Sequence, residues 1–83
     1  MSKKLFVGSL PWAMNDEALK EAFASHGNVI SANIVTDRHT GRSRGFGFVE
    51  FENDSEAAAA IKALDGSEID GRNIVVNEAK PKN

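Results

Sequence analysis

Residues 44–51 alternate between two kinds of side chain, as a β-strand does when its two faces meet different surroundings. The segment reads Arg-Gly-Phe-Gly-Phe-Val-Glu-Phe, and successive side chains of a strand point to opposite faces. One face of the predicted strand carries Gly45, Gly47, Val49 and Phe51. The other face carries Arg44, Phe46, Phe48 and Glu50. The charged ends mark this second face as the one exposed to solvent, although two phenylalanines stand at its centre.

These two phenylalanines need an explanation, because burying one phenylalanine side chain stabilises a protein by roughly 1.5–3 kcal/mol. Phe46 and Phe48 could be core residues, with Arg44 and Glu50 reaching solvent from the strand ends. Alternatively, the rings stay exposed because a flat ligand stacks on them. A second segment of the same design favours the second interpretation.

That segment, residues 5–10, reads Leu-Phe-Val-Gly-Ser-Leu. Its alternation gives one face Leu5 and Val7 and the other face Lys4, Phe6 and Gly8. Alone, the segment is weak evidence, because many buried strands have a similar pattern. Together with residues 44–51, about 40 residues later, it is stronger evidence, because both segments place a basic and an aromatic side chain on the face opposite aliphatic ones.

Two helices are predicted from their start signals and from apolar residues at helical spacing. Asn15 is expected to cap the first helix and Gly27 to end it in a left-handed conformation. Asn53 begins the second helix and is expected to form a capping box with Glu56, and Gly66 follows its end. The inward stripes are Leu19, Ala22 and Phe23 in the first helix and Ala57, Ala60, Ile61 and Leu64 in the second.

Two further strands complete a β-α-β-β-α-β order. The strand at about 29–36 is expected to point Ile30, Ala32 and Ile34 inward, with Asn33 and Val35 on the opposite face. Residues 37–43 form the loop that follows it. A turn within 69–72 precedes the last strand, at about 73–77, whose outward residues by parity are Val75 and Asn77.

This order predicts a ferredoxin-like α+β sandwich, in which a four-stranded antiparallel sheet has two helices on one face. An antiparallel sheet can leave its other face in water, and that face would carry the phenylalanines. Gly45 and Gly47 lie on the covered side, where the lack of a side chain lets a helix approach closely. We expect one domain over residues 1–83, with a core at about 4–79 and a short basic end at 80–83.

Composition limits the possible functions. The 83 residues contain no cysteine, which excludes disulfides, thiol nucleophiles and thiolate metal sites. No apolar stretch approaches the length of a membrane span, and the start does not resemble a signal peptide, so we expect a cytoplasmic protein without a membrane partner. His26 and His39 lack partners at ligand spacing, which favours surface or cap roles over metal binding. We therefore expect no metal and no cofactor.

The net charge of −2 is lower than nucleic-acid binders usually have. The distribution of charge matters more than its sum. Acidic residues gather in or beside the predicted helices, whereas basic residues gather in one loop and at the termini: Arg38, Arg42, Arg44, Lys3, Lys4, Lys80 and Lys82. We therefore expect an acidic back and a basic front.

The octapeptide 44–51 satisfies every constrained position of the ribonucleoprotein octamer, Lys/Arg-Gly-Phe/Tyr-Gly/Ala-Phe-Val-x-Phe/Tyr. With residues 5–10, it makes the chain resemble the RNA-recognition motif family over essentially its whole length, and most of all the small single-domain members of bacteria. The resemblance implies that Phe6 and Phe48 each stack under a base and that Phe46 packs across the riboses between them. It also implies that Arg44 contacts a phosphate or a base edge. The family often has Asn where this chain has Ser9, at a position that braces the next loop and does not read bases.

The other expected RNA-binding residues lie around these rings. Lys4 shares the face of Phe6, and parity adds residues of the flanking strands, while the resemblance adds the segment after the last strand. Arg38 and Arg42 are phosphate clamps or solvated loop charges, and Trp12 is expected at the domain edge. The full set beyond the rings and Arg44 is Lys4, Asn33, Val35, Arg42, Val75, Asn77, Ala79 and Lys80.

We therefore expect a monomer that binds single-stranded RNA, with single-stranded DNA as a second ligand, and that acts as an RNA chaperone or post-transcriptional regulator. One alternative is a protein-interaction variant of the fold. Such variants usually lose the octamer aromatics and carry Arg-x-Phe before the last strand, where this chain has Arg72-Asn73-Ile74. Another is a small enzyme such as an acylphosphatase, but residues 8–12 offer no arginine to cradle an anion. The sequence therefore predicts a protein that is not an enzyme.

Overall fold

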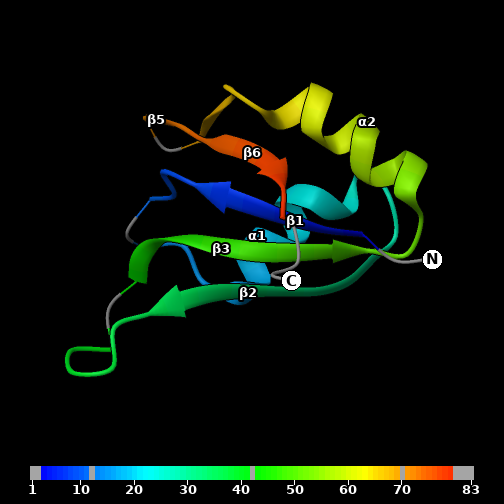
Figure 1. Ribbon diagram of the computed structural model, residues 1–83. Helices are drawn as coiled ribbons and strands as arrows, with labels where there is room; N and C mark the ends of the chain where they lie inside the picture. Colours follow the sequence, from blue (N-terminus) through cyan, green and yellow to red (C-terminus); the bar gives the residue numbers. More distant parts are fainter. Residues whose placement is uncertain (1–2, 12, 42, 70, 80–83) are drawn as a thin grey trace.

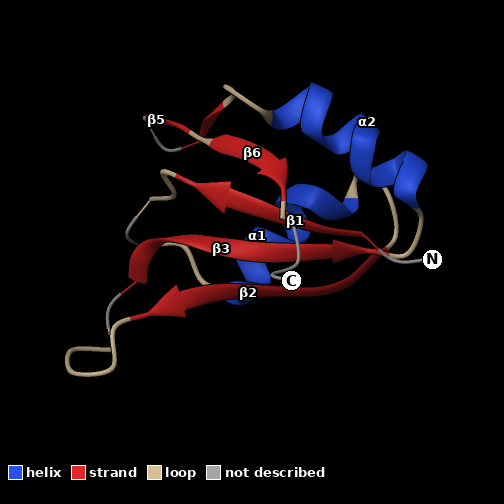
Figure 2. Cartoon of the chain, in the orientation of Figure 1, coloured by secondary structure: helices blue, strands red, loops and turns tan. Residues whose placement is uncertain are grey.

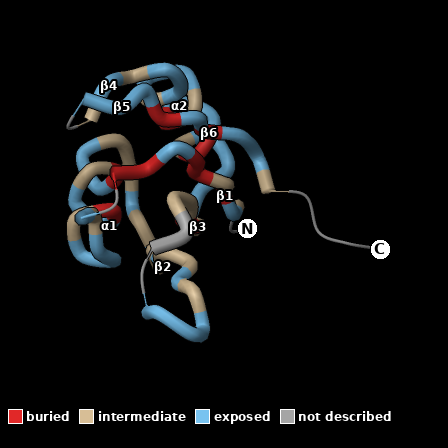
Figure 3. The backbone as a smooth tube through the Cα atoms, turned by 90° about the vertical axis from the view of Figure 1, so that its left-hand side faces the viewer, coloured by how far each residue is buried: buried red, intermediate tan, exposed pale blue. Residues whose placement is uncertain are grey.

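The computed structural model describes residues 3–11, 13–41, 43–69 and 71–79, without the side chains of Ser43 and Arg44. Its main sheet has four strands in the order β2-β3-β1-β6, and every neighbouring pair is antiparallel. The strands are β1 (Lys3–Gly8), β2 (Val29–Thr36), β3 (Ser43–Phe51) and β6 (Val75–Glu78). The helices α1 (Asp16–Ala24) and α2 (Asp54–Leu64) lie on one side of this sheet (Figures 1 and 3). The predicted ferredoxin-like α+β fold is confirmed.

The core lies between the sheet and the helices. The side chains that line it have relative exposures of 0 or 1 %, and Phe23 of α1 meets Phe51 of β3 with ring centroids 6.2 Å apart. Both predicted helical stripes face this core, with Ala22, Ile61 and Leu64 at its margin. The buried apolar residues are Leu5, Val7, Leu10, Leu19, Phe23, Val49, Phe51, Ala57, Ala60, Ile74 and Val76.

The first helix begins as predicted but does not end as predicted. The side chain of Asn15 accepts a hydrogen bond from the Ala18 N–H at 2.8 Å, which makes Asn15 the N-cap. The helix already ends at Ala24, and Gly27 is not among the residues with positive φ. A Cβ on Gly27 would stand 2.6 Å from the Cβ of Glu56. This position therefore needs glycine for close packing against α2, and not for a left-handed turn.

The second helix also follows the prediction in part. It begins after Asn53, and Gly66 after its end has a φ of 82°. The expected capping box is wrong, because the Glu56 carboxylate accepts from the backbone N–H of Asn28 at 3.0 Å and from the side-chain amide of Asn53 at 3.2 Å. Glu56 therefore ties α2 to the segment before β2, and it meets the N-cap residue Asn53 through that residue's side chain and not its backbone N–H.

The predicted inward position of Ile30 is wrong. Val29 pairs with Phe51 and Ser31 pairs with Glu50, so Ile30 is an extra residue in β2 at a β-bulge. Its side chain is 51 % exposed, while Val29 packs against the core beside Ala32 and Ile34. Strict alternation fails here because a bulge shifts the parity of one strand by one residue.

The glycines of β3 serve other purposes than the predicted close approach of a helix. A Cβ on Gly47 would lie 2.4 Å from the backbone oxygen of Asn33, so this glycine accommodates the neighbouring strand β2. Gly45 has a φ of 85° in a second irregularity of the β2–β3 ladder, and nothing lies within 4 Å of its Cβ position. Its carbonyl accepts from the Leu10 N–H at 2.8 Å, which joins the loop after β1 to β3.

The last strand is shorter and more broken than predicted. A two-stranded hairpin of β4 (Glu68–Ile69) and β5 (Arg72–Asn73) precedes it, and buried Ile74 separates β5 from β6 (Figure 2). The chain leading into the hairpin is tied to the end of α2, since the backbone N–H and the hydroxyl of Ser67 donate to the Leu64 carbonyl at 2.9 and 2.7 Å. Within the described residues, no helix has the length and apolar character needed to cross a membrane.

Candidate nucleic-acid interface

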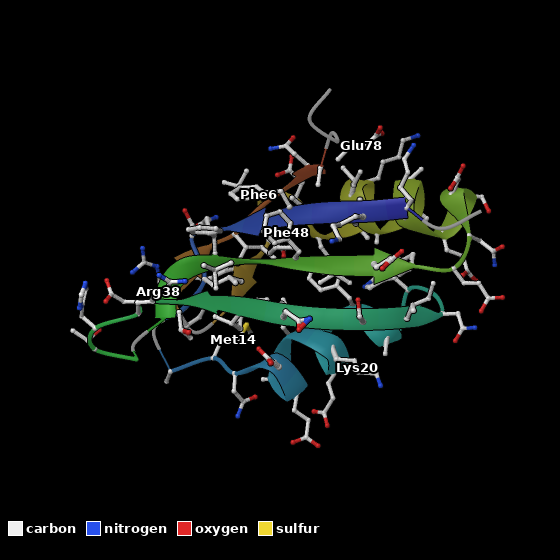
Figure 4. The ribbon with its side chains drawn as sticks, turned by 60° about the horizontal axis from the view of Figure 1, so that its bottom comes forward. Phe6, Met14, Lys20, Arg38, Phe48 and Glu78 are labelled. Atoms are coloured by element: carbon white, nitrogen blue, oxygen red, sulfur yellow. The ribbon has the colours of Figure 1, made fainter. Side chains whose placement is uncertain are left out.

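The phenylalanines of the sheet face that carries no helix form one cluster. The ring centroid of Phe6 lies 5.6 Å from that of Phe46 and 5.9 Å from that of Phe48, and the centroids of Phe46 and Phe48 are 6.3 Å apart. All are partly exposed, in contrast to Phe23 and Phe51. Figure 4 shows Phe6 and Phe48 on adjacent strands, on the side of the sheet opposite Lys20 of α1. We call these phenylalanines the ring cluster.

Strand register is what brings the ring cluster together. In the antiparallel pairing of β1 with β3, Phe6 stands opposite Phe48, and Gly8 stands opposite Phe46. Side chains opposite each other on one face of a sheet are near enough to interact. A Cβ on Gly8 would lie 3.0 Å from Cε1 of Phe6, so the bare glycine leaves the space into which the Phe6 ring leans.

Amide side chains continue this row on both sides. Asn33 of β2 stands opposite Phe48, and Asn77 of β6 stands opposite Phe6, so the row Asn33–Phe48–Phe6–Asn77 crosses the main sheet. Both asparagines are exposed. The apolar centre of the row is therefore bordered by groups that can both donate and accept hydrogen bonds.

The expected flanking residues lie around this row. Val75 is 40 % exposed at the end of β6, and Val35 is partly buried. Ala79 continues the pairing of β6 with β1, because its N–H donates to the Lys4 carbonyl at 2.9 Å. Arg42, Lys80 and Trp12 lie outside the described residues, and the side chain of Arg44 is not described.

The charges near the ring cluster are mixed. The Lys4 ammonium lies 5.8 Å from the centroid of Phe48, within range of a cation–π interaction. Glu50 stands opposite Lys4 in the ladder on this face, while the ion pair of Lys3 with Glu78 at 3.2 Å has the parity of buried Leu5 and belongs to the other face. The face is therefore not uniformly positive, and Lys4 places one positive charge beside the rings.

Arg38 stands apart from the ring cluster, in the loop between β2 and β3 (Figure 4). The Asp37 carboxylate accepts from the N–H groups of His39 at 2.7 Å and Thr40 at 3.2 Å, and the Gly41 N–H donates to the Asp37 carbonyl at 2.8 Å. The loop is therefore closed upon itself by local hydrogen bonds. It presents Arg38 and His39 to solvent.

The sequence did not indicate a hollow beside the ring cluster. This hollow has a volume of about 400 Å³, and Phe6 and Phe46 form one of its sides. The other lining residues are Gly8, Ser9, Gly45, Arg72 and Val75. Arg72 comes from the hairpin, whose position depends on tertiary packing, so alternation within the strands could not place it there. Within the described part of the chain, no group of His, Asp and Glu side chains is arranged to hold a metal ion.

Comparison with known proteins identifies the family and the fold. The family model of the RNA recognition motif matches residues 5–75. The chain belongs to this family. Among plant proteins, glycine-rich RNA-binding protein blt801 of Hordeum vulgare is 53 % identical to this chain over 79 residues. The match covers 95 % of this chain and 49 % of that protein. This chain is 56 % identical over 79 residues to the mitochondrial glycine-rich RNA-binding protein 4 of Arabidopsis thaliana, covering 95 % and 58 %.

The chain thus spans about half the length of these curated relatives. They are plant proteins, and they lend no support to the expected special likeness to bacterial single-domain members. Among solved structures, RNA binding protein PG1 aligns with a TM-score of 0.92 and 42 % identity over 98 % of both chains. The Rna15 RNA-recognition domain with bound GU RNA aligns with a TM-score of 0.85 and 26 % identity, over 96 % of this chain and 85 % of that one.

Proposed function

We propose that this protein binds single-stranded RNA by stacking bases on Phe6 and Phe48. The observation that carries the proposal is the row Asn33–Phe48–Phe6–Asn77, with exposed rings at its centre and exposed amides at its ends. Aromatic side chains stack on any base, because every base has a π-face. The amides can then donate to and accept from base edges or 2′-hydroxyls.

The shape of the surface favours single strands. A base can lie flat on a ring only if it is unstacked from its neighbours, and a duplex keeps its bases stacked inside. Phe46 leans at 34° to Phe6 and stands edge-on to Phe48, so it fits the space between two stacked bases, where the riboses pass. Phosphates or base edges would be met by the basic residues around the rings, Lys4, Arg44, Arg42 and Lys80. The apolar contact with the RNA would extend to Val35, Val75 and Ala79.

The relatives support the same function. Several plant relatives are named as glycine-rich RNA-binding proteins, and the Rna15 domain was solved with RNA bound. A role as an RNA chaperone or post-transcriptional regulator, a monomeric state and a single domain over residues 1–83 are our further proposals. An enzymatic activity forms no part of the proposal. The cytoplasmic location stays a prediction, because relatives include mitochondrial and chloroplastic proteins.

Titration of fluorescently labelled oligonucleotides tests the proposal. We expect saturable binding to an unstructured six-base RNA and at least tenfold weaker binding to a perfect RNA duplex of the same strand. Single-stranded DNA of the same sequence should bind more weakly only if an amide or backbone group contacts a 2′-hydroxyl. Equal affinity for the duplex, or no saturation with any single strand, would contradict the proposal and favour the protein-interaction alternative.

A further inference from the structure

The hollow beside the ring cluster has the walls of a base-binding pocket. Phe6, Phe46 and Val75 provide apolar surface, and Val75 is 40 % exposed although it is a large apolar residue. Gly8 opposes Val75 in the β1–β6 ladder and adds no side chain to fill the space. Ligand sites typically combine such apolar walls with a few placed polar groups.

Backbone strain marks the rim of the hollow. Ser9 has a φ of 57°, and it is the non-glycine residue with positive φ among the described residues. A left-handed conformation costs a residue with a side chain roughly 1–2 kcal/mol. The hydrogen bond from the Leu10 N–H to the Gly45 carbonyl holds the chain there at 2.8 Å. Such outliers concentrate at binding and active sites, and this one lines the hollow.

The hairpin supplies the charged group of the hollow. Arg72 of β5 lines it, and the neighbouring Asn73 side chain donates to the Gly66 carbonyl at 3.0 Å. The Gly66 N–H in turn donates to the Ile74 carbonyl at 2.8 Å, so the hairpin is fastened to the end of α2. A guanidinium has five N–H donors in a fixed fork, so it can keep a partner within the protein and still donate to a ligand.

The fork selects among bases by their pattern of acceptors. Guanine presents O6 and N7 side by side as acceptors, and bidentate arginine on this pair is the commonest specific contact to a base in protein–DNA complexes. Adenine places an amino donor where guanine has O6, so one arm of the fork would meet another donor. A pocket with apolar walls, a serine at the rim and an arginine fork therefore suits guanine.

We propose that the hollow binds one guanine base of the RNA strand that stacks on the ring cluster, with Arg72 donating to O6 and N7. This inference rests on the proposed function and adds a base preference to it. It assigns Arg72 and Ser9 to the interface, whereas the sequence analysis did not include Arg72 and gave the Ser9 position only a bracing role. The preference comes from the hairpin, while general affinity comes from the rings.

A guanine walk tests the inference. Labelled hexauridine and six variants with one guanine at successive positions are titrated with the protein, and adenine and cytosine are then placed at the best position. We expect guanine at one position to strengthen binding about tenfold over uracil, adenine or cytosine, the size of effect that one bidentate contact produces. Arg72→Lys keeps the charge but removes the fork, and should abolish this ratio.

Two further variants separate the pocket from general charge and folding. Val75→Phe narrows the hollow from another strand and should also abolish the guanine ratio with Arg72 intact. Lys20→Met removes a positive charge from the exposed surface of α1 and should keep the ratio. Circular dichroism of each variant reports whether the fold is preserved.

Each contrary outcome has one meaning. If the protein bound none of the hexamers, the proposed function itself would be overturned. Binding of all hexamers with equal affinity would leave that function standing and overturn the guanine pocket. A guanine ratio that survives Arg72→Lys, or cytosine that binds as tightly as guanine at the best position, would also overturn the pocket.

Discussion

Replacing Phe48 by alanine distinguishes a binding residue from a core residue. Phe48 lies in the ring cluster, with ring centroids of Phe6 and Phe46 at 5.9 and 6.3 Å and the Lys4 ammonium at 5.8 Å. Base–aromatic stacking is worth about 1–3 kcal/mol per base by alanine substitution. At 1.4 kcal/mol for each factor of ten, a central value of about 2 kcal/mol corresponds to roughly 30-fold weaker RNA binding.

Phe48→Ala should reduce the free energy of unfolding less than the loss of a buried phenylalanine does. Phe48 is partly exposed and loses two aromatic contacts, each worth about 0.5–1.5 kcal/mol. We therefore expect Phe48→Ala to lower the free energy of unfolding by about 1–3 kcal/mol. Phe51, on the same strand but on the covered face, is fully buried, and Phe51→Ala should lower it by about 3–5 kcal/mol.

Urea unfolding and fluorescence anisotropy with a six-base RNA measure the two effects separately. Phe48→Tyr is the matched control, because it keeps the ring and should bind nearly as tightly as the unchanged protein. We expect Phe51→Ala to leave the affinity of the folded fraction nearly unchanged. If Phe48→Ala unfolded the protein like Phe51→Ala while its folded fraction bound RNA normally, Phe48 would be a core residue and the stacking argument would be wrong.

Three further pairs of substitutions test the packing of β3, the capping of the helices and the charge at the interface. Gly47→Ala should lower the free energy of unfolding by about 2–3 kcal/mol, since its Cβ would meet the Asn33 backbone oxygen at 2.4 Å. Gly41 lies in open space at a φ of 73°, so Gly41→Ala should lower it by about 1–2 kcal/mol through backbone strain alone. Equal losses in urea unfolding would contradict the packing account. Asn15→Ala should lower the free energy of unfolding by about 1 kcal/mol. Asn53→Ala should lower it less, because of these two N-cap residues only Asn15 accepts a hydrogen bond with its side chain. A larger loss for Asn53→Ala in thermal unfolding would refute the assignment of Asn15 as the stronger cap. If Arg44 meets one phosphate, Arg44→Ala should make the slope of log affinity against log salt concentration shallower by about 0.7. Lys20→Met should leave this slope unchanged. An unchanged slope in Arg44→Ala would remove Arg44 from the interface.

Strand alternation predicted the ring cluster because β1 and the centre of β3 are regular. Phe6 and Phe48 face away from the core, and Leu5, Val7, Val49 and Phe51 are buried, as parity requires. The same rule failed at Ile30, where an extra residue in β2 reverses parity. A bulge is set by both strands of a pair, so the sequence of one strand does not reveal it.

Glycine positions were predicted less well than strand faces. Gly27 and Gly47 are constrained by atoms from distant parts of the chain, Glu56 and Asn33, and not by their own backbone conformation. The hairpin residue Arg72 and the left-handed Ser9 were missed for a similar reason. Their place beside the ring cluster depends on how β4–β5 and the loop after β1 pack onto the sheet, which local patterns do not report.

The position of β1 between β3 and β6 has a consequence for synthesis of the protein. Phe6 pairs with Phe48 on one side and with Asn77 on the other, so each contact of this residue in the sheet joins segments far apart in the chain. Such non-local pairing forms late, because the intervening chain must first be ordered. During translation, β1 therefore emerges long before either of its partners, with both edges unpaired. A growing chain would complete the row Asn33–Phe48–Phe6–Asn77 only once β6 has left the ribosome.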